Sequence, residues 1–288
     1  KTLMAEAVAG ETGKPYVFLA GADLTAMPLL ATKERALEIG RLGHRVFARL
    51  YQAAVPTFAF VNGAALGGGL ELALHCDYRT VSAGAGLLAL PECSFGLIPG
   101  WGGSHLLPNL IGPAAAVKVI VENPLTQNTM LKPVQARELG IVDELFEPAD
   151  FLERCLEWAA DVVRGTVTVP RRPADPPQEW QAALARGKAY ADGKVHGAAP
   201  APYRALDLIA RAEHGSFAEN TVAEDEALAD LLVSPQLRAG LYAFDLVRRR
   251  AKRPVGAPDA GLARDVTAVG IVGAGLMASQ LALLFARR

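Results

Sequence analysis

Residues 67–71 (GGGLE) place three consecutive glycines two positions before a glutamate, a combination that can do chemistry. They follow a buried strand predicted over residues 57–61 and begin a helix that we expect to start near Gly68. Glycine costs backbone entropy, so three in a row indicate that something needs the space of the missing Cβ atoms. Free N–H groups at a helix start can bind a developing oxyanion, and Glu71 lies one turn further on the same face. The alternative is a tight packing turn with an exposed glutamate.

Two further segments place polar or small residues at the ends of predicted strands. Glu92 follows a strand predicted over residues 87–90 and precedes the glycine-rich turn at residues 96–103 (GLIPGWGG). A glutamate in this position can face a cleft, and the alternative is a carboxylate that caps a helix. In residues 18–24 (FLAGADL) another predicted strand runs into a small-residue turn, for which an ordinary aspartate-containing turn is the alternative.

These three segments, in this order and at this spacing, resemble the crotonase superfamily of enoyl-CoA hydratases and isomerases. The resemblance implies a ββα spiral fold that binds acyl-coenzyme A thioesters. It also implies that the backbone N–H groups of Ala22 and Gly68 form an oxyanion hole for the thioester oxygen. Glu71 and Glu92 match the two catalytic glutamates of hydratases, and Gly100 matches a glycine whose N–H helps to hold the catalytic water.

The reaction implied by this resemblance is the hydration of a trans-2-enoyl-CoA to an L-3-hydroxyacyl-CoA, as in fatty-acid β-oxidation. Glu71 would orient and deprotonate the water that attacks C3, and Glu92 would deliver a proton to C2. Each acid or base role is worth roughly 10²–10⁴-fold in rate. Two close carboxylates should raise at least one pKa and titrate as a pair. The presence of both glutamates favours hydration, because isomerases of the family keep only one of them or replace both. A Δ3,Δ2-enoyl-CoA isomerase is the alternative within the family.

A further glycine pattern lies near the end of the chain, where β-branched residues 266–272 precede Gly273, Gly275 and Ala278. GxGxxA between a strand and a helix is the fingerprint of dinucleotide binding, here for NAD, and its alternative is a glycine-rich turn. The acidic residue that completes the fingerprint, about 20 residues further on, would lie past Arg288. This order of motifs resembles the bifunctional α-subunits of fatty-acid β-oxidation complexes, in which a hydratase domain precedes an NAD-dependent 3-hydroxyacyl-CoA dehydrogenase domain.

The elements that must position these residues fall into three regions. Residues 1–165 alternate β-rich runs with amphipathic helices, which predicts an α/β crotonase (enoyl-CoA hydratase) domain that lacks its N-terminal part. Proline-rich breaks introduce a helical connector over residues 166–265, and residues 266–288 begin a Rossmann domain with its first strand and helix. The expected strands cover 16–19, 57–61, 77–81 and 87–90, and the expected helices cover 32–53, 101–110, 113–122, 178–191, 203–214, 221–232 and 235–250.

Several other side chains are expected to be structural. Thr32 is the expected N-cap of the first helix, whose apolar residues are Leu37, Leu42, Val46, Phe47 and Leu50. The scattered histidines are expected to be structural or surface residues: His44, His105, His196 and His214. Cys76 and Cys93 are expected to be small core residues. The pair of Glu71 and His75 is too small to form a metal site, so no metal is expected.

The composition of the 288 residues excludes several classes of protein. Hydrophobic residues make up 51% and charged residues 20%, so the chain can bury a full core. With 29 Lys and Arg against 30 Asp and Glu, the formal net charge of −1 argues against a dedicated nucleic-acid-binding protein. Three cysteines without a CxxC pair exclude a disulfide scaffold and a cysteine zinc site, and they fit a reducing, cytoplasmic compartment.

The ends of the chain and its expected partners complete the prediction. Residue 1 is lysine and residue 288 falls inside an apolar run, so we expect both ends to be cuts within a longer polypeptide. Residues 266–286 lack charges, but a strand, a glycine turn and a helix explain them better than a tail anchor, so no integral membrane segment is expected.

The expected partners are an acyl-CoA substrate, a thiolase subunit and further subunits of a homo- or hetero-oligomer. The alternative outside enzymes is a non-catalytic module that docks a thiolase through residues 178–250.

Overall fold

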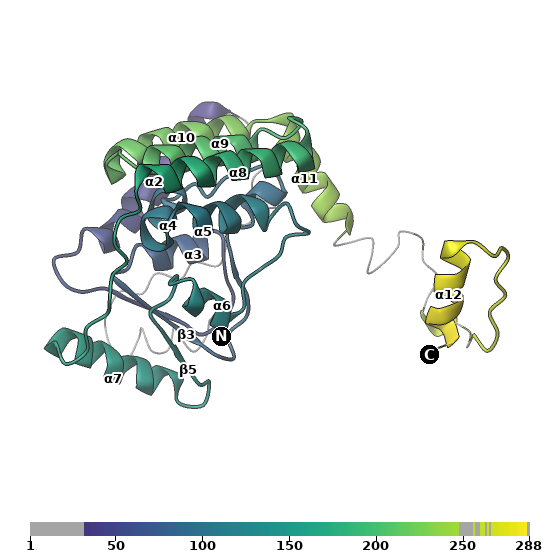
Figure 1. Cartoon of the computed structure of the whole chain (residues 1–288), viewed down its shortest axis with the longest axis horizontal. Coiled ribbons are helices and arrows are strands. Elements are labelled where there is room, and N and C mark those ends of the chain that lie inside the picture. The colour runs from purple at the N-terminus through teal and green to yellow at the C-terminus, as the bar shows by residue number, and fades with distance from the viewer. Residues whose placement is uncertain (1–31, 248–255, 257–259, 263, 265, 287–288) are drawn as a thin grey trace. The chain divides into compact units, whose positions relative to one another are not determined.

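The computed structural model describes residues 32–247, 256, 260–262, 264 and 266–286, in one unit up to Phe244 and a second from Asp245 (Figure 1). The strand predicted over 16–19 lies outside the described residues. The elements up to the boundary are, in chain order, α2 (Lys33–Tyr51), β1 (Phe58–Val61), β2 (Ala65–Leu66), α3 (Gly68–Leu74), β3 (Tyr78–Ser82), β4 (Leu88–Ala89), the 3₁₀-helix η2 (Glu92–Ser94), α4 (Gly103–Ile111), α5 (Pro113–Val117), the π-helical turn η3 (Lys118–Glu122), α6 (Pro133–Glu138), β5 (Glu144–Phe146), α7 (Phe151–Arg164), α8 (Pro177–Val195), α9 (Ala201–Ala212), α10 (Phe217–Leu232) and α11 (Pro235–Asp245).

Among the described residues of the first unit, the strands form two small parallel sheets. β1, β3 and β5 make one sheet with β3 in the centre, and β2 and β4 make the other. In the larger sheet Phe60 lies opposite Thr80, and Thr80 lies opposite Glu144. Parallel strands need crossover connections, and helices supply these here. The predicted α/β class is confirmed, although the short strands β2 and β5 are not among the predicted ones.

Helix α2 turns mainly small residues toward the interior. Thr32 caps it as predicted, because its hydroxyl accepts a hydrogen bond from the Arg35 N–H at 3.3 Å. The predicted apolar stripe is wrong in part, since Leu42 and Val46 lie at the surface. The buried face consists of Ala36, Gly40, Gly43, His44 and Phe47. These small residues let α10 and the Trp101 ring approach the helix closely.

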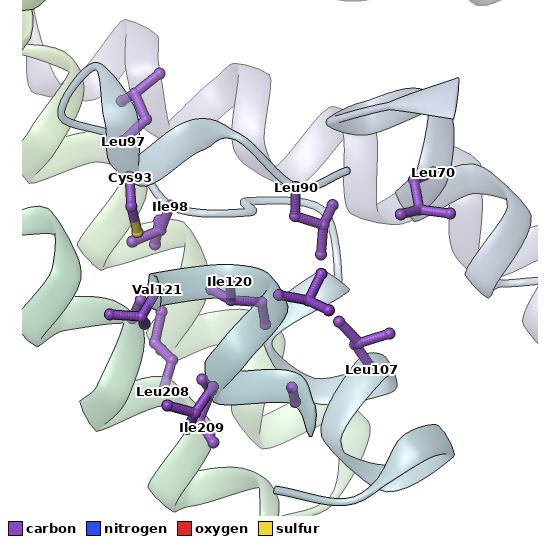
Figure 2. Close-up of a cluster of buried hydrophobic side chains, with 14 of the residues drawn as sticks. Leu70, Leu90, Cys93, Leu97, Ile98, Leu107, Ile120, Val121, Leu208 and Ile209 are labelled. Atoms are coloured by element: carbon purple, nitrogen blue, oxygen red, sulfur yellow. The ribbon is translucent and has the colours of Figure 1, made fainter. Parts of the chain in front are cut away.

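Helices α8, α9 and α10 lie side by side as a layer over α4 and α5 (Figure 1). A cluster of buried apolar side chains fills the space between the layers, and Figure 2 shows part of it. Ile120 of η3 and Ile209 of α9 both belong to this cluster and are fully buried. Residues predicted as the hydratase domain therefore share one core with helices predicted as the connector.

The second unit is described through two helical segments, η5 (Ala260–Leu262) and α12 (Leu276–Ala286). The predicted helix after Gly275 is confirmed. The predicted strand over 266–272 is not present, because a strand needs a neighbour to satisfy its backbone groups and the described residues of this unit offer none. Across the described part of the chain, no helix combines the length and the apolar character that a membrane crossing requires.

Helix α10 begins with a capping box whose removal should be measurable. The Ser216 hydroxyl accepts a hydrogen bond from the Glu219 N–H at 3.3 Å, and the Glu219 carboxylate accepts one from the Ser216 N–H at 2.9 Å. We expect Ser216→Ala to lower the free energy of unfolding by about 1 kcal/mol, because an N–H at the helix start loses its acceptor. Urea unfolding followed by circular dichroism measures this, with Thr168→Ala in an exposed loop as the control. Equal stability of the two variants would contradict the prediction.

Candidate active site

The chain turns sharply between β2 and α3 at Gly67, whose φ of 54° is rare for a residue with a side chain. A Cβ atom at this position would lie 2.6 Å from Oε1 of Glu92. Gly67 therefore permits both the turn and the close approach of Glu92. The helix predicted to start near Gly68 is confirmed. The N–H groups of Leu70 and Glu71 donate to the Gly67 carbonyl, whereas those of Gly68 and Gly69 have no acceptor within the helix.

Glu71 lies in the first turn of α3 and is almost completely buried. Its Oε1 accepts hydrogen bonds from the backbone N–H groups of Trp101, at 2.7 Å, and Gly103, at 2.9 Å. Burial raises the pKa of the Glu71 carboxyl to about 7, and the charge of Glu224 adds to this rise, whereas the two backbone hydrogen bonds and His44 oppose it. Glu71 therefore exchanges a proton near neutral pH while it holds the start of α4 in place.

Glu92 opens the 3₁₀-helix η2 and is also buried. Among the described residues its Oε2 has no hydrogen-bond partner. Burial raises the pKa of the Glu92 carboxyl well above its usual range, and the charge of Glu71 adds to the rise. The structure thus brings the two predicted glutamates close enough for the charge of Glu71 to add to the raised pKa of Glu92.

The other predicted residues of this site are the backbone donors. A Cβ atom at Gly68 would lie 2.9 Å from the Trp101 ring, so that ring packs beside the first residue of α3. A Cβ atom at Gly100 would lie 2.5 Å from the side chain of Leu228, which packs on this loop from α10. Ala22, the second predicted oxyanion donor, lies outside the described residues.

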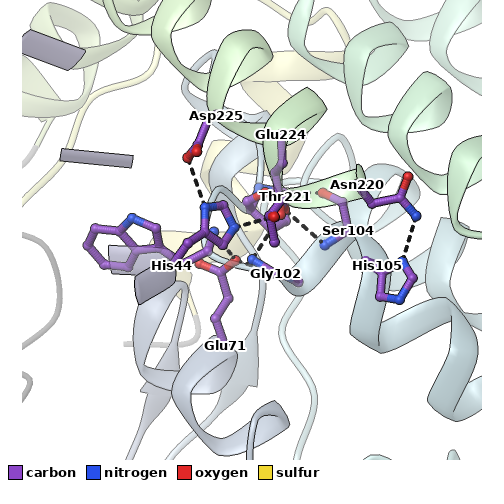
Figure 3. A network of polar contacts seen from close by, with 12 residues as sticks. His44, Glu71, Gly102, Ser104, His105, Asn220, Thr221, Glu224 and Asp225 are labelled. Carbon is purple, nitrogen blue, oxygen red and sulfur yellow. Dashed lines mark hydrogen bonds and ion pairs between the residues drawn. The ribbon is translucent and has the colours of Figure 1, made fainter. Parts of the chain in front are cut away.

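A buried ionic network adjoins Glu71, and sequence reasoning did not find it (Figure 3). The Nδ1 atom of His44 lies 2.8 Å from Oδ1 of Asp225, and its Nε2 atom lies 3.1 Å from Oε2 of Glu224. Two ionised carboxylates can each accept only if both ring nitrogens carry protons. Burial opposes the charge, but the hydrogen bonds with Asp225 and Glu224 outweigh it and raise the pKa of His44 to about 10. His44 is therefore an imidazolium held between two acids.

Glu224 also binds the loop that Glu71 holds. Its Oε2 accepts a hydrogen bond from the Gly102 N–H at 2.9 Å, and its Oε1 accepts one from the Ser104 N–H at 3.3 Å (Figure 3). Four successive backbone N–H groups, from Trp101 to Ser104, thus alternate between the carboxylates of Glu71 and Glu224. Since α10 supplies Glu224, a helix outside the sequence motifs takes part in the site.

One sequence signal could have pointed to Glu224. In α10 it stands three, four and seven residues before Ala227, Leu228 and Leu231, which are all buried, so it occupies a core position of the helical pattern. An acid at such a position is unusual unless it is paired. The partner His44 lies far away in the sequence, and no local pattern links the two.

The remaining titratable neighbours are structural. The Nδ1–H of His75 donates to the backbone carbonyl of Glu71 at 2.8 Å, and burial lowers the pKa of His75 to about 4, so the ring is neutral. Cys76 and Cys93 are buried, in agreement with the prediction of small core residues. Within the described ranges, no group of three or more His, Cys, Asp or Glu side chains is arranged to hold a metal ion.

Comparison with known proteins places this chain in a family. The family model described as enoyl-CoA hydratase/isomerase matches residues 8–172, which is more than half of the chain. The chain belongs to the enoyl-CoA hydratase/isomerase family. The fatty acid oxidation complex subunit alpha of Shewanella loihica is 31% identical over 277 residues, which cover 94% of this chain and 38% of that protein. The corresponding subunit of Shewanella frigidimarina is 30% identical over the same shares. The chain thus spans well under half the length of these relatives.

Solved structures confirm the crotonase-like fold of this hydratase/isomerase family chain. A carnitinyl-CoA dehydratase from Mycobacterium thermoresistibile matches with a TM-score of 0.58 and 22% identity, over 90% of this chain and 86% of that one. An enoyl-CoA hydratase from Bacillus halodurans matches with a TM-score of 0.53 and 19% identity, over 78% and 76% of the two chains. At these identities the likeness concerns the fold.

The predicted dinucleotide fingerprint lies beyond the part of this hydratase/isomerase chain that the family model matches. Gly273 has a φ of 115°, and apart from chain neighbours no atom of the described residues lies within 4 Å of a Cβ position at Gly273 or Gly275. Helix α12 begins directly afterwards, so its first N–H groups lie beside an open glycine turn. These features fit a bound phosphate, and Gly273, Gly275 and Ala278 remain a prediction for NAD.

Proposed function

We propose that this chain hydrates trans-2-enoyl-CoA thioesters to L-3-hydroxyacyl-CoA. The observation that carries the proposal is the pair of buried glutamates at the start of α3. Glu71 exchanges its proton near pH 7, whereas the pKa of Glu92 is held well above the usual range of a glutamate. When the environments of two carboxylates push their pKa values apart in this way, the group with the lower pKa can serve as a general base and the other as a general acid.

The proposed reaction adds one water molecule across the C2–C3 double bond. Ionised Glu71 takes a proton from the water as the oxygen bonds to C3, and the π electrons move toward the thioester oxygen. The backbone N–H groups of Gly68 and Ala22 stabilise the negative charge on that oxygen, and the loss of one such donor typically costs about 2.7–4 kcal/mol. Protonated Glu92 then donates to C2, and the proton on Glu71 returns to Glu92 before the next turnover. The N–H of Gly100 helps to hold the water.

The likeness to fatty acid oxidation complex subunits extends this proposal to the whole protein. In that setting the chain serves fatty-acid β-oxidation, and the same polypeptide oxidises the 3-hydroxyacyl-CoA product with NAD bound at Gly273, Gly275 and Ala278. A thiolase subunit would then be its partner. The chain covers 38% of the length of that relative, which is compatible with hydration and oxidation by different segments of one longer polypeptide.

Hydration of a four-carbon trans-2-enoyl-CoA by the purified chain tests the proposal. We expect the absorbance of the conjugated thioester to fall, and we expect chiral chromatography to identify the L-3-hydroxy product. A matching assay with a 3-enoyl-CoA checks for double-bond migration. Conversion of the 3-enoyl substrate without hydration of the 2-enoyl one would replace the proposal by an isomerase. A folded chain that converts neither substrate would contradict both activities.

A further inference from the structure

The start of α4 is held from two sides by acids on different helices. Glu71 of α3 binds the backbone N–H groups of Trp101 and Gly103, and Glu224 of α10 binds those of Gly102 and Ser104. Both carboxylates are almost completely buried, at 2% and 1% exposure. The hydrogen bonds to these consecutive residues fix the two acids against one short piece of backbone. Any change of charge on Glu224 therefore acts on Glu71 at close range and through little water.

His44 holds Glu224 in turn. It lies between Glu224 and Asp225 with both ring nitrogens within hydrogen-bond distance of a carboxylate (Figure 3). Helix α2 can carry the imidazole this close to α10 because Gly40 lacks a side chain, and a Cβ atom there would lie 2.6 Å from Asp225. The imidazole thus gives each of the two buried acids of α10 a hydrogen-bond partner.

We propose that Glu224, supported by His44, is a positioning residue that fixes the loop at residues 101–104 against Glu71 and sets the proton affinity of Glu71. The inference rests on the hydration chemistry proposed above, because it assigns Glu224 a part in preparing the general base. Neither residue belongs to the glycine and glutamate motifs that carry the family resemblance. Glu224 acts through Glu71 and the loop, and it is not assigned a contact with the substrate.

The charges that face Glu71 determine in which direction Glu224 shifts the pKa of Glu71. Negative Glu224 on α10 favours the protonated form of Glu71, and positive His44 on α2 favours the ionised form. Burial raises the pKa of Glu92 on η2 well above its usual range, and His75, which donates to the Glu71 carbonyl, is neutral because burial lowers its pKa to about 4. Asp225 balances His44 from its far side. Removal of the charge on Glu224 therefore leaves the His44 cation facing Glu71 and makes Glu71 more acidic.

The test is a titration of Glu71 in Glu224→Gln. Glutamine keeps the shape of the side chain and an oxygen for the Gly102 N–H. The chain is labelled with ¹³C at the glutamate carboxyl carbon, and Glu71→Gln identifies the Glu71 signal. We expect the midpoint of Glu71, about 7 in the original chain, to fall by roughly one pH unit or more. Glu224→Asp, which keeps the charge, should titrate close to the original chain.

The matched control is Glu226→Gln, the same change two residues along α10 on a half-exposed side chain that pairs with Lys33. It should leave the Glu71 midpoint unchanged. If Glu224 only stabilises the fold, Glu224→Gln will lower the free energy of unfolding without moving the midpoint, and that result would overturn the inference. A shifted midpoint in a chain that hydrates no enoyl-CoA would support the coupling and refute the proposed function. If the chain is active, the acid limb of its kcat/KM profile should move with the midpoint.

Discussion

Glu92→Gln should lower kcat/KM for hydration of a trans-2-enoyl-CoA by roughly 10²–10⁴-fold. Glutamine has nearly the shape of a protonated glutamate but cannot give a proton to C2. Because the lost interaction belongs to the transition state, the decrease should appear in kcat rather than in KM. Initial rates from the absorbance of the conjugated thioester measure the effect. The fold should tolerate the change, since it removes a buried carboxyl whose Oε2 has no partner among the described residues.

The pH profile adds a second readout to this prediction. Glu71 must be ionised to accept a proton, so the rate should rise as the pH passes through its pKa of about 7. Glu92 must be protonated, so the rate should fall again as the pH passes through its raised pKa. Glu92→Gln should therefore abolish the basic limb and keep the acid limb. Glu153→Gln on the exposed face of α7 is the control. A folded Glu92→Gln variant with more than a tenth of the original kcat would refute the role of Glu92 as the acid.

Local signals in the sequence were sufficient for the starts of α2 and α3, which carry His44 and Glu71. Thr32 predicts the start of α2, and the glycines before Glu71 predict the start of α3, because capping and positive φ angles are properties of a few adjacent residues. The roles of Glu71, Glu92, Gly68 and Gly100 came from resemblance to a family rather than from these signals. The structure supports the proximity of the two glutamates, and their chemical roles remain a proposal.

The rest of the site depends on contacts that no local pattern contains. Helices α2 and α10 meet through the small residues of α2. The prediction that its leucines and valine form the buried face was therefore wrong in part. His44 and Glu224 are separated by 180 residues, and each looks ordinary without the other. The strand predicted over 266–272 shows the same limit, because β-branched residues favour a strand that only a neighbouring strand can complete.

The buried network gives the second large effect, which concerns stability. We expect His44→Ala to lower the free energy of unfolding by about 3–5 kcal/mol near pH 6.5, because it leaves Glu224 and Asp225 buried without their cation. Urea unfolding followed by circular dichroism measures the loss. The matched control is His214→Ala, which removes a largely exposed histidine and should change stability by less than about 0.5 kcal/mol.

The pH dependence of this loss has a definite sign. The pKa of His44 is about 10 in the folded chain, against an ordinary value of 6.5. The folded state therefore binds one more proton than the unfolded state between these two values, and its stability falls as the pH rises. The stabilisation by His44 is fully present below pH 6.5 and is lost as the pH passes through about 10. The difference in free energy of unfolding between the original chain and His44→Ala should decrease over this pH interval. Groups that titrate in the same way in both chains contribute equally to both free energies, so their contributions cancel.

A triple variant separates the charge from the missing ring. His44→Ala/Glu224→Gln/Asp225→Asn has the same cavity as His44→Ala but no buried acid at this place. If unpaired charge causes the loss, the triple variant should be more stable than His44→Ala near neutral pH. The difference in free energy of unfolding between the original chain and the triple variant should still decrease with rising pH, as His44 of the original chain loses its proton. If the two variants are equally unstable at every pH, the cavity accounts for the loss, and His44 does not stabilise the fold through its charge. The comparison remains informative even if His44→Ala is largely unfolded, because recovery of the fold by two neutral side chains identifies the buried carboxylates as the cause.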